Sequence, residues 1–240
     1  MIQALVFDFD GLILDTETAW YRSFSELYEE HGTSLPLDVW GQCVGAGEEI
    51  FDPYAELESR IGRAIDREEL TERVRQKMTA YLGAHALRPG VRKYLQTAAR
   101  LGLKIGLASS SRRTWVEGHL RQYGLLDYFQ CLLTADQVSK TKPDPELYEK
   151  ALQCLGVKAE DAVAFEDSPN GVTAAKRAGM FCVLVPNPVT AQLAFRTAYD
   201  LKIGSMAEMD LETLLDRLNS PTPVLPSASR QKAAQPGEGK

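Results

Sequence analysis

The chain has 240 residues, enough for one large domain or for a core with a smaller inserted domain. Hydrophobic residues make up 44% and charged residues 25%, which is ordinary for a folded globular protein and excludes a disordered or fibrous chain. The net charge of −6 argues against general nucleic-acid binding, because phosphate backbones attract clustered Lys and Arg. No stretch approaches the roughly 18 consecutive apolar residues of a membrane span, and the N-terminus lacks the basic start of a signal peptide.

The cysteines are far apart in the sequence and have no paired metal-ligand spacing. We therefore expect buried or isolated thiols rather than zinc ligands or disulfides. Such thiols are typical of a reducing compartment, so the sequence predicts a cytoplasmic location. The four residues are Cys43, Cys131, Cys154 and Cys182.

Short apolar runs alternate with helical patterns along most of the chain. Each run is typical of a buried parallel strand, and the apolar spacing of three and four between the runs indicates amphipathic helices. A strand followed by a helix, repeated, predicts an α/β fold with a doubly wound parallel sheet. The expected strands are 4–7, 104–108, 162–165 and 181–185, with helices around 91–98 and 147–155.

Residues 16–87 break this alternation, because they show helical spacing and no convincing strand. We interpret them as an all-helical domain inserted after the first strand, with Arg88-Pro89-Gly90 as the return linker. The α/β core would then comprise residues 1–15 and 88–219. Residues 220–240 hold four of the twelve prolines and few large apolar side chains, which predicts a flexible tail.

Carboxylates follow two of the predicted strands directly. Asp8 and Asp10 come after the first strand, and Glu166 and Asp167 close the strand 162–165. Open α/β sheets place their active sites at the carboxyl ends of the strands, so these side chains should share one crevice. Crowded carboxylates need a cation or a shared proton, and oxygen ligands from separate strand ends suit Mg²⁺. The sequence therefore predicts a magnesium site.

Two further strand ends supply groups that bind phosphate. Ser109 and Ser110 offer hydroxyls and backbone N–H groups, and Lys142 offers a positive charge. Phosphoryl transfer depends on positioning and on stabilising charge on phosphate oxygens. Each segment alone also fits a cap, a turn or a solvated surface residue; their joint occurrence at successive strand ends favours a phosphoryl-transfer site.

With these motifs in order, the chain resembles the haloacid dehalogenase superfamily, in particular the β-phosphoglucomutase-like phosphatases that carry a helical cap. The resemblance covers about residues 1–215. It rests on Asp8-Phe9-Asp10-Gly11-Leu12 with Asp15-Thr16, on Ser109, on Lys142 before Pro143-Asp144-Pro145, and on Glu166-Asp167-Ser168 with Asn170-Gly171.

The resemblance implies that Asp8 attacks phosphorus to form an aspartyl phosphate, while Asp10 serves as general acid and then general base. It implies that Mg²⁺ is held by the side chains of Asp8 and Asp167 and the backbone carbonyl of Asp10, with Glu166 acting through water. Ser109 and Lys142 would bind the transferring phosphoryl group. Further contacts to phosphate or substrate are expected from Ser110, Asn170, Lys77 and Glu48.

The predicted cap departs from the true mutases at two positions. Trp20 stands where they carry a histidine, and Glu48 stands where a basic residue receives a second phosphate. An acid at that position repels a phosphate, so we expect hydrolysis of a small phosphorylated metabolite, such as a sugar phosphate. The alternatives are a β-phosphoglucomutase-type isomerase, a non-catalytic binding module and, less compatible with a complete metal set, a dehalogenase.

Overall fold

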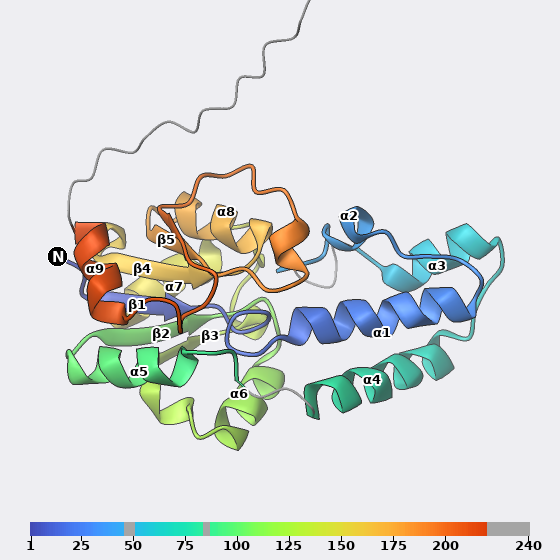
Figure 1. Ribbon diagram of the computed structural model, residues 1–240, viewed down its shortest axis with the longest axis horizontal. Coiled ribbons are helices and arrows are strands. Elements are labelled where there is room, and N and C mark those ends of the chain that lie inside the picture. Colours follow the sequence, from blue (N-terminus) through green and yellow to red (C-terminus); the bar gives the residue numbers. More distant parts are fainter. Residues whose placement is uncertain (46–50, 84–86, 220–240) are drawn as a thin grey trace, which may run out of the picture.

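The computed structural model describes residues 1–45, 51–83 and 87–219. At its centre lies a parallel sheet in the strand order β3-β2-β1-β4-β5-β6 (Figure 1). The doubly wound α/β fold expected from the sequence is confirmed. The order reverses between β1 and β4, and such a switch point opens a crevice at the carboxyl edge of the sheet. The strands are β1 (Ala4–Phe7), β2 (Lys104–Ala108), β3 (Cys131–Leu133), β4 (Ala162–Glu166), β5 (Phe181–Leu184) and β6 (Leu201–Lys202).

Helices cover both faces of the sheet because side chains alternate along each strand. Leu5 and Phe7 pack with α5, α6 and α9 on one face, whereas Ala4 and Val6 pack with α7 and α8 on the other. All four side chains are fully buried. The helices of the core are α5 (Val91–Arg100), α6 (Arg113–Gln122), α7 (Glu146–Leu155), α8 (Pro169–Arg177) and α9 (Leu211–Asn219).

Strands β3 and β6 were not expected from the sequence. They contain three and two residues, too few for a periodic pattern to be recognised. Both lie at the edges of the sheet, where a strand is hydrogen-bonded to one neighbour only. Tertiary pairing with β2 and β5, rather than local sequence, places them in the sheet.

In the described parts of the chain between β1 and α5, four helices extend to one side of the core (Figure 1). They share an apolar cluster that includes Phe24, Tyr28, Trp40 and Leu57. The long α1 and α4 pack against each other, and Asp15 caps α1 by accepting a hydrogen bond from the Thr18 backbone. The helices are α1 (Thr16–Glu30), α2 (Leu37–Trp40), α3 (Pro53–Ile61) and α4 (Arg67–Gly83).

Arg88, in the segment that returns to the core, is hydrogen-bonded to the segment that leaves the core for these helices. Its backbone N–H donates to the carbonyl of Ile13 at 3.0 Å. Its guanidinium group donates to the carbonyls of Gly11, Val185 and Pro186 at 2.6 to 2.8 Å. The exit and return segments therefore lie side by side, next to the loop after β5.

The expectation of four free thiols was wrong for two cysteines. Cys131 at the start of β3 and Cys154 near the end of α7 form a disulfide, with their Cα atoms 6.2 Å apart. Their sequence separation of 23 conceals this proximity, which arises because α7 packs on β3. Cys43 and Cys182 are free thiols.

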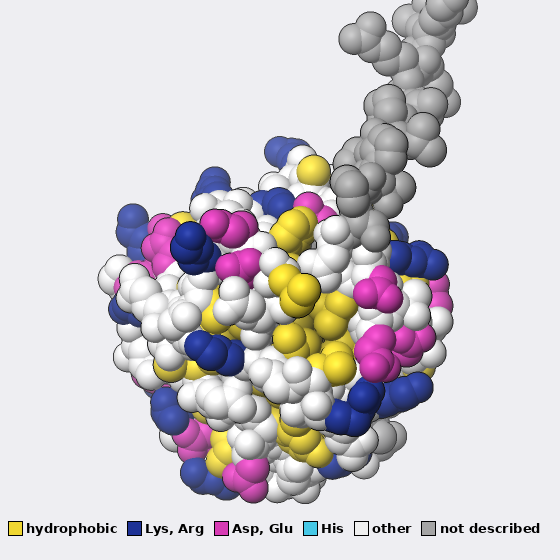
Figure 2. Space-filling view, turned by 90° about the vertical axis from the view of Figure 1, so that its left-hand side faces the viewer, with side chains coloured by type: hydrophobic (Ala, Val, Ile, Leu, Met, Phe, Trp, Pro, Cys, Tyr) yellow, Lys and Arg dark blue, Asp and Glu magenta, His cyan; other side chains and the backbone are white. Residues whose placement is uncertain are grey.

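Figure 2 shows the end of the molecule that lies away from α1 to α4. On this face basic and acidic side chains are interspersed, with small apolar areas between them. Among residues 1–45, 51–83 and 87–219, no helix has the length and apolar character needed to cross a membrane. The predicted tail, residues 220–240, lies outside the described residues.

Candidate active site

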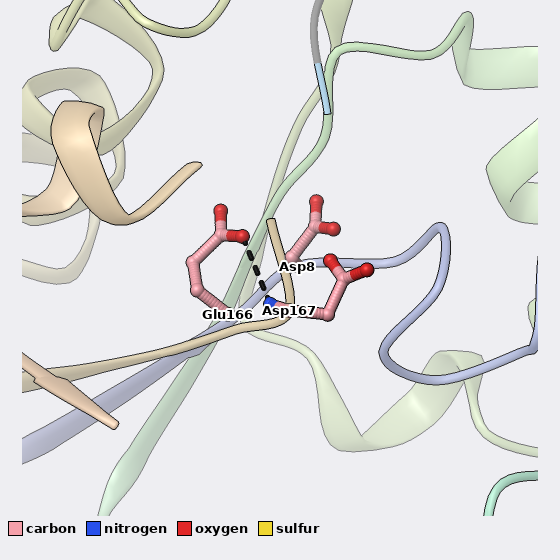
Figure 3. Close-up of side chains that lie close together, drawn as sticks. All are labelled: Asp8, Glu166 and Asp167. Atoms are coloured by element: carbon pink, nitrogen blue, oxygen red, sulfur yellow. Dashed lines mark hydrogen bonds between the residues drawn. The ribbon is translucent and has the colours of Figure 1, made fainter. Parts of the chain in front are cut away.

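Three carboxylates meet at the switch point of the sheet. Asp8 directly follows β1, Glu166 is the last residue of the adjacent strand β4, and Asp167 follows it (Figure 3). The two strand ends are in register, because Phe7 pairs with Phe165 and the Asp8 backbone N–H donates to the Phe165 carbonyl at 3.0 Å. One oxygen from each carboxylate lies within 4.8 Å of the others. All three side chains are buried.

Lys142 places a positive charge inside this cluster. Its ammonium group lies 2.5 Å from an oxygen of Asp8 and 2.7 Å from an oxygen of Glu166. The same Glu166 oxygen accepts a hydrogen bond of 2.5 Å from Tyr148 on α7. Burial alone would lower the pKa of Lys142, but the carboxylates of Asp8 and Glu166 outweigh it and raise that pKa. Lys142 is therefore a fully buried cation that Asp8 and Glu166 stabilise.

The single positive charge of Lys142 does not neutralise the three carboxyl groups of the cluster. Burial raises the pKa of Asp8 to about 8, although Lys142 opposes the shift. Burial, followed by the charges of Asp8 and Glu166, also holds the pKa of Asp167 well above its usual value. A second cation would favour the ionised form of these carboxyl groups.

The donor set fits a divalent metal ion. Asp167 Oδ2 accepts a hydrogen bond of 2.6 Å from Asn187, whereas its buried Oδ1 has no hydrogen-bond partner among the described residues. An orphaned buried oxygen beside two further carboxylates leaves ligand capacity unused. Hard oxygen donors of this kind are the ligands that Mg²⁺ prefers.

Gly11 lets the loop after β1 pass close to the carboxylates. Its φ of 77° lies in the left-handed region, and a Cβ atom there would collide with Asp167 and Asn187. Ser168 then caps α8 by accepting a hydrogen bond of 3.0 Å from the Gly171 backbone. These two turns fix the backbone on both sides of the carboxylates.

The Asp10 carboxylate is directed toward the loop after β2. Its Oδ2 accepts hydrogen bonds from Ser111 at 2.6 Å and from the buried Ser109 at 3.4 Å. Its Oδ1 accepts a hydrogen bond of 3.0 Å from the indole of Trp115 on α6. The structure thus brings Asp8, Asp10, Ser109, Lys142, Glu166 and Asp167 to one edge of the sheet.

The remaining predicted contacts lie elsewhere. Ser110 donates to the carbonyl of Gly45 at 3.1 Å, and Asn170 donates to the carbonyl of Val44 at 3.0 Å, so both join the core to the inserted segment. Lys77 forms ion pairs of 3.0 and 2.7 Å with Glu26 and Glu30 of α1. Trp20 is half-buried and stacks on Phe24. Glu48 lies outside the described residues.

Sequence reasoning missed three groups that support the site. Asn187 follows β5, so the same search of strand ends would have found it. Tyr148 and Trp115 lie within amphipathic helices, where an aromatic residue indicates core packing and gives no sign of a hydrogen bond to a carboxylate.

Glu17, in the first turn of α1, is a further buried carboxyl, 8% exposed. Burial, then the charges of Asp10, Asp8 and Asp15, raise its pKa well above the usual value. Its folded form therefore keeps a proton that the unfolded chain releases as the pH rises above about 4.5, and stability falls by up to about 1.4 kcal/mol per pH unit until the folded pKa is reached. We expect Glu17→Gln to remove this loss.

Denaturant titration in EDTA from pH 4 to pH 8 would measure this difference. The free energy of unfolding of Glu17→Gln should match the wild type at the acid end and exceed it increasingly toward neutral pH. Glu29→Gln, at an exposed position of the same helix, is the matched control and should follow the wild type throughout. A Glu17→Gln curve parallel to that of the wild type would contradict the prediction.

Residues 5–185 match the family described as haloacid dehalogenase-like hydrolase. The match spans well over half of the 240 residues, so the chain belongs to this family. A structure described as "putative beta-phosphoglucomutase from Thermotoga maritima" is 27% identical and superposes with a TM-score of 0.68, covering 90% of this chain and 99% of that one.

Several relatives extend this result. The protein of Bacillus subtilis (strain 168) called "Putative phosphatase YhcW" is 54% identical over 220 residues, covering 92% of this chain and 99% of the relative. Hexitol phosphatase B of Escherichia coli (strain K12) is 31% identical, covering 89% and 97%. CbbY from Rhodobacter sphaeroides in complex with phosphate superposes with a TM-score of 0.66 at 28% identity, covering 87% and 96%. The β-phosphoglucomutase of Clostridium difficile, at 24% identity and a TM-score of 0.71, covers 91% and 98% and shows the shared fold.

Proposed function

We propose that this protein is a Mg²⁺-dependent phosphatase that hydrolyses a small phosphorylated metabolite through an aspartyl phosphate on Asp8. The observation that carries the proposal is the buried cluster at the switch point, in which Lys142 holds Asp8 at 2.5 Å beside an orphaned oxygen of Asp167. Relatives named hexitol phosphatase B and phosphorylated carbohydrates phosphatase support a sugar phosphate as the substrate class.

In this proposal, each residue of the site carries out a different part of the reaction. Asp8 attacks the phosphorus atom, the bond to the leaving oxygen breaks, and Asp10 gives that oxygen a proton. Asp10 then takes a proton from the water that hydrolyses the aspartyl phosphate, which releases inorganic phosphate and restores Asp8. Lys142 and Ser109 stabilise the negative charge on the phosphoryl oxygens.

Mg²⁺ would be held by the side chains of Asp8 and Asp167 and by the backbone carbonyl of Asp10, with Glu166 acting through water. When bound, the ion supplies positive charge that neutralises phosphoryl oxygens and favours ionised carboxylates. Asn187 fixes the orientation of Asp167 by donating to Oδ2, so that Oδ1 remains free to ligate.

We propose that residues 16–87 act as a cap that selects the leaving group and shields the reaction from bulk water. Support comes from Ser110 and Asn170, which hold the segment that ends at Gly45 against the core. The two ion pairs of Lys77 favour a role in joining α1 to α4.

A panel of phosphorylated metabolites would test the proposal by measuring phosphate release with Mg²⁺ and with EDTA. We expect release from at least one sugar phosphate, lost in EDTA and restored by added Mg²⁺. β-Glucose 1-phosphate with a bisphosphate primer belongs in the panel, because primed conversion to glucose 6-phosphate without phosphate release would show a mutase instead. No turnover of any compound would count against an enzyme for this class of substrate.

A further inference from the structure

Asp10 is the proposed proton donor, and its carboxylate is held on both oxygens. Ser111 and Ser109 donate to Oδ2, and Trp115 donates to Oδ1 at 3.0 Å. The hydroxyl groups can also accept a hydrogen bond, whereas an indole N–H can only donate. The contact from Trp115 therefore requires Oδ1 to remain an acceptor, so a proton on Asp10 belongs on Oδ2.

The indole is itself fixed in place by packing. Trp115 lies in the first turn of α6, and its ring meets the ring of His119, one helical turn later, edge to face with centroids 4.3 Å apart. His119 in turn stacks on Phe9 with centroids 6.1 Å apart, and Phe9 is fully buried next to Asp10 in the chain. A continuous set of rings thus links α6 to the backbone that carries Asp10.

We propose that Trp115 is a positioning residue that orients the Asp10 carboxyl for proton transfer to the leaving group, an inference that rests on the proposed function. Because the indole occupies Oδ1 as a donor, Oδ2 is the oxygen that gives the proton to the leaving oxygen and takes it back from water. Without the N–H group the carboxyl can rotate about its Cβ–Cγ bond, and proton transfer loses its alignment.

This role predicts a defect that depends on the leaving group. A sugar alkoxide leaves with difficulty unless it is protonated, whereas p-nitrophenolate is a stable anion that needs little help. The value of kcat/KM covers the steps from free enzyme through formation of the aspartyl phosphate, so it isolates this proton transfer from the later hydrolysis. A residue with a purely structural role would lower kcat/KM for both substrates alike.

The test compares Trp115→Phe with the wild type on p-nitrophenyl phosphate and on the sugar phosphate that the wild type hydrolyses fastest. Phenylalanine keeps an aromatic ring against His119 and removes the N–H group. We expect kcat/KM for the sugar phosphate to fall on the order of 10-fold, part of the roughly 10²- to 10⁴-fold that general acid–base catalysis supplies, with less than about 2-fold change for p-nitrophenyl phosphate. Trp115→His, whose imidazole keeps an N–H donor, should recover part of the loss.

Trp40→Phe is the matched control, because the buried indole of Trp40 in the inserted segment has no hydrogen-bond partner among the described residues. Its ratio of the two kcat/KM values should equal that of the wild type.

Equal losses on both substrates, or no loss on either, in Trp115→Phe would overturn the positioning role while leaving the phosphatase proposal intact. A wild-type protein without phosphatase activity would instead defeat the proposed function itself. If Trp115→Phe fails to fold, Trp115→His takes its place: a larger loss of kcat/KM for the sugar phosphate than for p-nitrophenyl phosphate supports the role, and equal losses on both substrates, or none, refute it.

Discussion

Asp8→Asn is expected to abolish phosphate release, with kcat falling on the order of 10⁴-fold or more, as for the loss of other covalent nucleophiles. An amide cannot attack phosphorus, and no other described carboxyl group lies within 4 Å of the Lys142 ammonium except Glu166. Phosphate release and intact mass after acid quenching would measure the effect. Wild-type protein quenched during turnover should carry one added phosphoryl group, and Asp8→Asn should carry none.

The variant should remain folded, because burial already raises the pKa of Asp8 to about 8 and a neutral side chain is tolerated at this position. Asp216→Asn, at an exposed position on α9, is the matched control and should retain full activity. Undiminished turnover by Asp8→Asn would mean that another group attacks phosphorus or that water attacks directly.

Lys142→Met is expected to affect both activity and stability. Loss of the buried ammonium group removes the charge that stabilises the phosphoryl oxygens, so kcat/KM should fall on the order of 10²- to 10³-fold. It also leaves Asp8 and Glu166 buried without their cation, and breaking a buried ion pair costs about 3 to 5 kcal/mol. Steady-state kinetics and denaturant unfolding in EDTA would measure the two effects.

The stability loss should depend on pH in a defined direction. The lysine opposes the raised pKa of Asp8, so without it the folded protein holds a proton to higher pH than the wild type does. The unfolded chain releases this proton at about pH 4 in both proteins, so the difference in stability between them grows only as the pH rises through about 8, where Asp8 of the folded wild type ionises and Asp8 of the folded variant does not. Lys158→Met, which breaks only an exposed pair with Glu160, should cost less than about 1 kcal/mol. A pH-independent loss, or one as small as in the control, would contradict this account.

The core of the fold could be predicted because its central strands are continuous apolar runs. Strand β1 is buried on both faces and β4 likewise, so their sequences contain little except apolar residues before the terminal acids. That same abrupt change from apolar to acidic marked Asp8, Glu166 and Asp167 as neighbours in space. Edge strands with two or three residues carry no such pattern, which is why β3 and β6 were missed.

Contacts that form only through tertiary packing could not be predicted from the sequence. Nothing local joins Trp115 to Asp10, which precedes it by 105 residues, and nothing joins Cys131 to Cys154. Long side chains were also hard to place, since Lys77 has several directions open to it and the two acids on α1 that hold it are 47 and 51 residues away. Residues whose backbone is set by a strand end were therefore predictable, and residues positioned by helix packing were not.

The hydrogen bond between Arg88 and Ile13 brings together the start and the end of the inserted segment, and this arrangement affects how related proteins can diverge. Because Ile13 and Arg88 are hydrogen-bonded neighbours, the chain segment between them leaves and rejoins the core at one point. A segment inserted in this way can be lengthened, shortened or exchanged in evolution while the strands on either side keep their register. Changes between residues 13 and 88 can therefore leave the strand ends that carry Asp8 and Glu166 in place.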